Sequence, residues 1–207
     1  VLILATVGFL VTSFMLSGAI PTMIVYGLDL LTPKLFLPVG CILCAIVGMA
    51  CGSSWTTTAT IGLAFLGIGA GLGIPAPITA GMIISGAYVG DKFSPLSDTT
   101  NLAAAVAETG LFDHVTAMVS TTGPTLLLSL ILYTILGLNV DTSAYDATVA
   151  EGIQEAFRSA FTISPILLLP IIVVIVMCIL RVPGLVGIAV SVATAVVFML
   201  IFQSTDI

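Results

Sequence analysis

The hydrophobic and polar positions of this chain form long apolar stretches separated by short polar breaks. Four stretches are close to the ~20 residues that an α-helix needs to cross a bilayer: residues 1–26, 115–138, 160–180 and 182–202. Three shorter apolar stretches cover residues 35–51, 57–73 and 78–89. The pattern predicts an all-α polytopic membrane protein that folds as a helical bundle.

Composition and charge support the same fold class. Hydrophobic residues make up 59% of the 207 positions and charged residues only 7%, whereas soluble domains carry roughly 25% charged residues. We therefore expect the lipid bilayer as the main partner. The net charge of −6 argues against a nucleic-acid partner. Much of the acidic charge lies in residues 139–159, which are expected to form an extramembrane linker.

The first polar break, "GSSWTTTAT", joins two of the short apolar stretches. Two short helices joined by a tight polar turn can enter the bilayer and return to the same side, provided that the turn is buried in protein or lines a wet cavity. Residues 35–73 are thus predicted as a re-entrant helical hairpin, and an ordinary turn between two spanning helices is the alternative. The candidate substrate-binding residues at its tip are Ser53, Ser54, Trp55, Thr56 and Thr57.

The second polar break, "GDKFSPLSDTTN", begins at Gly90. A helix is expected to end there, because Pro95 lacks the N–H group of a helical residue and obstructs the turn before it. Ser97 or Asp98 can then cap a new helix. Residues 78–109 are therefore predicted as one discontinuous transmembrane helix, with a water-exposed loop as the alternative.

Interrupted helices with polar breaks are typical of the binding sites of secondary transporters. A carboxylate at bilayer depth is costly and is usually paired or functional. Hydroxyl, amide and carbonyl oxygens beside it suit a hard cation such as Na⁺, and a desolvated carboxylate also exchanges protons. We predict a cation and proton site with Na⁺ at Asp98 as the first choice and Asp91 as the second. The neutral oxygens come from Ser94, Ser97, Thr99, Thr100 and Asn101.

Lys92 lies between these carboxylates in the sequence and has three possible roles. It can pair with Asp91 or Asp98, exchange a proton itself, or attract an anionic group of a substrate. We expect no cofactor beyond the transported Na⁺ and H⁺. An enzyme is not predicted, because the only histidine, His114, lies outside the breaks and no G-x-S-x-G motif is present.

The two polar breaks also resemble a known family. "CGSSWTT", "GAYVGDKFSPLSDTTNLA" and "LFDHV" are similar to runs of the NhaC-type Na⁺/H⁺ antiporter family, within the ion transporter superfamily. The resemblance is clear over residues 15–120 and looser beyond them. It implies exchange of Na⁺ for H⁺ by alternating access in a prokaryotic cell membrane.

The resemblance also bears on what surrounds this chain. It implies that the chain is one half of an inverted-repeat transporter, with the second half of the same protein missing, and a homodimer is one expected assembly. The family includes exchangers of small organic acids such as malate and lactate. A Na⁺- or H⁺-coupled exchanger of such acids is therefore the alternative function.

Overall fold

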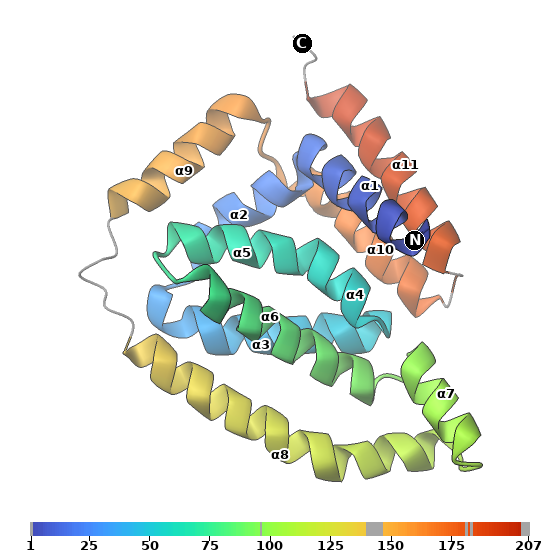
Figure 1. The fold of residues 1–207 in the computed structure, drawn as a ribbon. Coiled ribbons are helices and arrows are strands. Elements are labelled where there is room, and N and C mark those ends of the chain that lie inside the picture. The colour runs from blue at the N-terminus through green and yellow to red at the C-terminus, as the bar shows by residue number, and fades with distance from the viewer. Residues whose placement is uncertain (1, 96, 140–146, 181, 183, 204–207) are drawn as a thin grey trace.

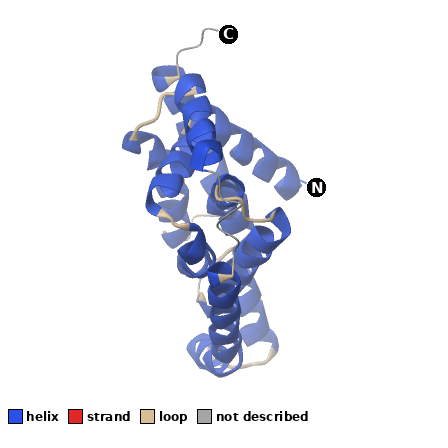
Figure 2. Cartoon of the chain, turned by 90° about the vertical axis from the view of Figure 1, so that its left-hand side faces the viewer, coloured by secondary structure: helices blue, strands red, loops and turns tan. Residues whose placement is uncertain are grey.

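The computed structural model describes residues 2–95, 97–139, 147–180, 182 and 184–203. All regular structure in these residues is helical (Figure 2), which confirms the all-α prediction. The helices are α1 (Leu2–Leu16), α2 (Ala19–Leu30), α3 (Pro33–Cys51), α4 (Ser54–Thr57), the π-helical turn η1 (Thr58–Gly62), α5 (Leu63–Gly71), α6 (Ala76–Phe93), α7 (Asp98–Val106), α8 (Leu111–Leu138), α9 (Ala147–Ala160), the 3₁₀ turn η2 (Pro165–Leu168), α10 (Leu169–Ile179) and α11 (Gly184–Phe202).

Several of these helices meet the length and hydropathy requirements of a membrane span. Helices α3 and α8 are each long and apolar enough to cross a bilayer. Two bent pairs, α1 with α2 and α9 with η2–α10, raise the number to four if each pair is one span; the bends are 68° and 89°. The chain is therefore an integral membrane protein.

The two bends interrupt the apolar stretch over residues 1–26 and the start of the stretch over residues 160–180, both of which were predicted as candidate spans from their length. The first span breaks at Gly18, whose φ of 80° lies in the left-handed region that glycine adopts without steric cost. The second breaks after Ala160, and η2 starts at Pro165, where a missing N–H is tolerated in a first turn. Both residues are visible in the sequence, but the length of an apolar stretch does not show whether the helix bends.

Gln203, just beyond the end of α11, joins the two bends. Its side-chain Nε2 donates to the carbonyl oxygens of Ser17 at 3.1 Å and Thr162 at 3.3 Å. Its Oε1 accepts a hydrogen bond from the Thr162 backbone N–H at 2.9 Å. One amide thus satisfies backbone groups that the two helix breaks release.

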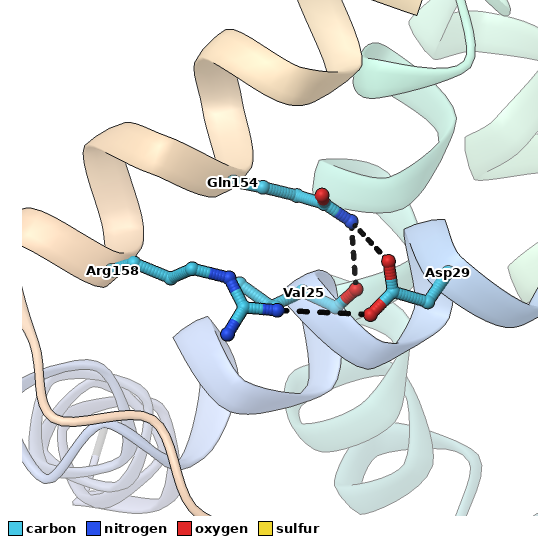
Figure 3. A network of polar contacts seen from close by, with 4 residues as sticks. All are labelled: Val25, Asp29, Gln154 and Arg158. Atoms are coloured by element: carbon cyan, nitrogen blue, oxygen red, sulfur yellow. Dashed lines mark hydrogen bonds and ion pairs between the residues drawn. The ribbon is translucent and has the colours of Figure 1, made fainter.

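Part of the predicted linker over residues 139–159 forms the amphipathic helix α9, which lies across α2 (Figure 3). Gln154 Nε2 donates to Asp29 Oδ1 at 2.9 Å and to the Val25 carbonyl oxygen at 3.2 Å. Arg158 Nη2 lies 3.7 Å from Asp29 Oδ2. Both charged side chains are about half exposed, so this ion pair contributes only about 0–1 kcal/mol. Residues 140–146 of the predicted linker lie outside the described residues.

The most extensive helix pair is α3 with α6, which lie side by side in Figure 1. The contact depends on small residues that let the two backbones approach. A Cβ atom on Gly86 would collide with the Cys41 carbonyl oxygen, and one on Gly90 would lie 2.7 Å from the Met49 backbone nitrogen. This glycine seam fixes the end of α6, and with it the second polar break, against the end of α3.

The glycine seam generates a stability prediction for Gly90→Ala. The added methyl group would force α3 and α6 apart, and overpacking of this kind costs about 1–3 kcal/mol. We expect a lower thermal unfolding midpoint for the full-length protein in detergent. Gly152→Ala on α9 is the matched control, because a Cβ there meets nothing within 4 Å. Equal midpoints for the two variants would contradict the seam.

Candidate functional site

The second polar break is a helix, a short irregular segment and a second helix. Helix α6 ends at Phe93 and α7 begins at Asp98. Helix α6 is longer than predicted, so Asp91 and Lys92 lie in its last turn and not in an unwound loop. The prediction was wrong because Pro95 removes the hydrogen bond to the carbonyl four residues earlier, that of Asp91, and crowds that carbonyl. The turns up to Gly90 are not affected, and the helix continues to Phe93.

The missing N–H of Pro95 is compensated at the Asp91 carbonyl oxygen, which a helical residue 95 would have bonded. That oxygen accepts hydrogen bonds from the Ser94 backbone N–H at 3.2 Å and from Thr100 Oγ1 at 3.3 Å. Thr100 itself is buried. The break is therefore stabilised by its own polar residues.

Asn101 and Ser97 also support the break. Asn101 Nδ2 donates to the carbonyl oxygens of Pro95 at 2.9 Å and Ser97 at 2.8 Å. Ser97 occupies the N-cap position of α7, as expected, but its side chain makes no capping hydrogen bond. Its hydroxyl lies instead 2.9 Å from Thr99 Oγ1, inside the site.

The first polar break forms a compact tip between α3 and α4. Gly52, with φ of 62°, ends α3, and Ser53 is the N-cap of α4. Ser53 Oγ accepts hydrogen bonds from the Thr56 backbone N–H at 3.2 Å and from Thr56 Oγ1 at 3.1 Å. Thr57 Oγ1 donates to the Ser53 carbonyl oxygen at 2.9 Å. The hydroxyls of Thr56 and Thr57 thus both bond Ser53 within the tip, Thr56 at its side chain and Thr57 at its backbone carbonyl.

The two arms of the predicted hairpin meet mainly at this tip. Helix α3 packs along its length against α6, while α5 contacts α2 and α6. With 19 residues, α3 is itself long enough to cross a bilayer. The re-entrant hairpin was predicted because both of its helices looked too short to cross a bilayer. That reason does not hold for α3.

The tip and the break meet at one pocket of about 190 Å³. Its lining residues are Gly52, Ser53, Ser54, Trp55, Tyr88, Asp91, Lys92, Ser97, Asp98 and Thr99. Eight of these are site residues predicted from the sequence. Of the other predicted residues, Ser94, Thr56, Thr57, Thr100 and Asn101 do not line the pocket. The tertiary structure thus joins the two breaks but leaves part of each outside the cavity.

Asp91 is the buried carboxylate of the pocket, with only 5% of its surface exposed. Its Oδ2 accepts a hydrogen bond from Thr99 Oγ1 at 3.2 Å. Lys92 Nζ donates to the same Thr99 oxygen at 3.2 Å. Among the described residues, no direct ion pair joins Lys92 to Asp91 or Asp98. The ammonium group and the carboxylate are connected through a hydroxyl.

Asp98 occupies a different environment. It is exposed and lies in the first turn of α7, where a negative charge is favoured by the helix dipole. Trp55 is also at the surface, with 65% of its area exposed. Both side chains line the pocket and are exposed, whereas Asp91 is buried.

Tyr88 is a lining residue that sequence reasoning missed. It lies one helical turn before Lys92 on α6, so the two side chains share a face. That spacing was visible in the sequence. It places Tyr88 in the pocket only if Lys92 is helical, which the structure shows.

The donor set of the pocket consists of carboxylate and hydroxyl oxygens with one ammonium group. Within the described part of the chain, no group of three or more His, Cys, Asp or Glu side chains is arranged so that it could hold a metal ion. Oxygen ligands of this kind suit a hard cation such as Na⁺.

Comparison with known proteins places this site in a family context. A sequence model of the Na⁺/H⁺ antiporter family matches residues 86–207, which include the second break and α7. No solved structure matches the chain.

Three characterised relatives are similar over most of the chain. The malate-2H(+)/Na(+)-lactate antiporter of Bacillus subtilis is 38% identical over 207 residues, covering 100% of this chain and 44% of its own length. The arginine/ornithine antiporter ArcD of Halobacterium salinarum is 42% identical over 197 residues, covering 94% and 41%. The Na(+)/H(+) antiporter NhaC of Alkalihalophilus pseudofirmus is 38% identical over 197 residues, covering 95% and 42%.

The chain thus spans less than half the length of these relatives. The family match nevertheless covers more than half of the chain and contains both carboxylates of the pocket. This chain belongs to the Na⁺/H⁺ antiporter family.

Proposed function

We propose that the protein is a secondary active transporter that exchanges Na⁺ for H⁺ by alternating access in a prokaryotic cell membrane. The observation that carries this proposal is the buried Asp91 carboxylate, which lies among hydroxyls in a pocket walled by two polar breaks. Family membership and the relative named as a Na(+)/H(+) antiporter support it.

Asp91 carries the exchange in this proposal, with Asp98 as a second ligand in the pocket. An ionised carboxylate removed from water is costly unless a positive charge compensates it. Na⁺ and H⁺ each provide that compensation, and they exclude each other at one carboxylate. Asp98 is exposed, so water solvates its charge without a bound cation. The neutral ligands are Ser97 and Thr99 from the break, with Ser53 and Ser54 facing them from the tip.

The architecture we propose is one half of an inverted-repeat transporter, with residues 35–73 as a re-entrant hairpin. The relatives are more than twice as long as this chain. Leu102 and Val106 on α7 are 66% and 76% exposed beside the site. The remainder of the protein would cover them and close the pocket from that side.

Substitution of the two aspartates tests which carboxylate carries the ion. In everted vesicles containing the full-length protein, Asp91→Asn should abolish Na⁺-driven collapse of a proton gradient, because the amide neither binds a proton nor neutralises Na⁺. Asp98→Asn should retain exchange with a higher half-saturating Na⁺ concentration, about two- to fivefold, the scale of one exposed charge interaction. A pH-sensitive dye reports the gradient.

Asp113→Asn is the matched control, because Asp113 is exposed in the first turn of α8 and lies outside the pocket. Its exchange should equal that of the wild type. If Asp91→Asn transported normally while Asp98→Asn were inactive, the assignment would pass to Asp98. If neither substitution changed the flux, the pocket would not be the ion site.

A second candidate function is coupled exchange of small organic acids. Lys92 and the N-terminus of α7 both face the pocket, and ammonium groups and helix N-termini favour carboxylates. One relative is named as a malate-2H(+)/Na(+)-lactate antiporter. This candidate requires Lys92 to hold the substrate and not only to balance charge.

Adding organic acids to the same vesicles separates the two functions. For a Na⁺/H⁺ antiporter, malate or lactate at constant Na⁺ should leave the rate of gradient collapse unchanged. A rate that depends on malate or lactate, and that Lys92→Gln removes, would favour the second function. The Asp113→Asn variant again provides the unaffected reference.

A further inference from the structure

The Thr99 hydroxyl contacts three polar side chains of the pocket. Lys92 Nζ lies 3.2 Å away, Ser97 Oγ lies 2.9 Å away and Asp91 Oδ2 lies 3.2 Å away. Lys92 comes from the last turn of α6, whereas Thr99 and Ser97 belong to the start of α7. The hydroxyl therefore connects the two sides of the helix break.

Hydrogen-bond capacity fixes the direction of each contact. A hydroxyl has one hydrogen to donate and two lone pairs to accept with, an ammonium group only donates, and an ionised carboxylate only accepts. Thr99 must therefore donate its hydrogen to Asp91 and accept one from Lys92. The remaining contact requires that Ser97 donates to Thr99. These three bonds use the one hydrogen and both lone pairs of the Thr99 hydroxyl.

A cation that enters the pocket cannot coordinate Thr99 until one of the two donors withdraws. Ser97 is fully buried and occupies the N-cap position of α7, inside the break. Lys92 is only half-buried, and its flexible stem carries a strongly hydrated charge. Lys92 is thus the donor that can leave at least cost. A cation at Asp91 would also repel the nearby ammonium group, which drives the departure in the same direction.

We propose that Lys92 is an internal competitor of the transported cation, and that Thr99 is the residue that positions it. With no cation bound, Lys92 compensates the Asp91 charge through the Thr99 hydroxyl. With Na⁺ bound, the Thr99 oxygen coordinates the ion and the Lys92 side chain turns to the water of the pocket. This inference rests on the proposed function and adds to it the replacement of Lys92 by Na⁺ at the Thr99 oxygen.

The charged and titratable groups of the pocket support such an exchange. Helix α6 contributes Asp91, Lys92 and Tyr88, and α7 contributes Asp98. The tip supplies only glycine, serine and tryptophan to the lining. Lys92 is therefore the one positive charge among the lining residues, so its movement changes the local charge balance by a full unit.

Chemical modification of Lys92 tests the exchange directly. Purified full-length protein in detergent is treated with an amine-acylating reagent, in NaCl or in choline chloride at equal ionic strength, and peptide mass spectrometry follows the acylation. Na⁺ should accelerate acylation of Lys92 about tenfold, the scale of one hydrogen bond made by a charged group. Lys34, at the other end of α3 and exposed, is the internal control and should react equally in both salts.

Two variants of Thr99 separate the hydroxyl from the shape of the side chain. Thr99→Ser keeps the hydroxyl and should keep the Na⁺ effect. Thr99→Val keeps the shape but removes the acceptor, so Lys92 should react rapidly in both salts. If Thr99→Val does not fold, Lys92→Met in vesicles gives a second measurement. Removing the competitor should lower the half-saturating Na⁺ concentration about tenfold, again the scale of one such hydrogen bond.

The outcomes distinguish this inference from the proposed function. If vesicles show Na⁺-driven proton flux while Na⁺ leaves Lys92 acylation unchanged or slows it, the competitor role is overturned and the antiporter stands. An unchanged or raised half-saturating concentration in Lys92→Met would have the same meaning. If the wild type shows no Na⁺-driven flux, the proposed function fails, and the competitor role fails with it.

Discussion

The close approach of α3 and α6 is the constraint on which the site depends. Glycines at the contact allow backbone-to-backbone packing that any side chain would prevent. Because α3 leads directly into the tip and α6 leads directly into the break, their contact brings both polar segments to one end of the helix pair. The pocket is the consequence of that geometry, and no single segment would form it alone.

Within the pocket, the burial of one carboxylate organises the polar groups around it. The Asp91 side chain and its carbonyl oxygen are each bonded by a threonine of α7, Thr99 and Thr100. The start of α7 is therefore tied to the end of α6 across a proline that interrupts the helix. The same threonine that holds the carboxylate also holds Lys92. Charge compensation and the shape of the break thus depend on the same few atoms.

Helices are also interrupted away from the pocket, at the two bends of the chain. The bends at Gly18 and after Ala160 release backbone carbonyls, and Gln203 satisfies them with one amide. Helix α9 is attached to α2 through Gln154 and Arg158 (Figure 3). These contacts are polar and partly exposed, so each contributes little stability on its own. They link the bent segments to one another and α9 to α2.

The sequence by itself determined the fold class, the two polar breaks and the types of oxygen they contain. Composition indicates a membrane protein and Pro95 must interrupt a helix; each follows from local chemistry, whereas the roles of Gly52 and Ser53 as helix caps were seen only in the structure. Only the tertiary structure decided that α3 pairs with α6, that Tyr88 reaches the pocket, and that Asp91 is buried while Asp98 is exposed. Burial depends on what lies opposite a residue in space, and two aspartates seven positions apart carry no local signal of that difference.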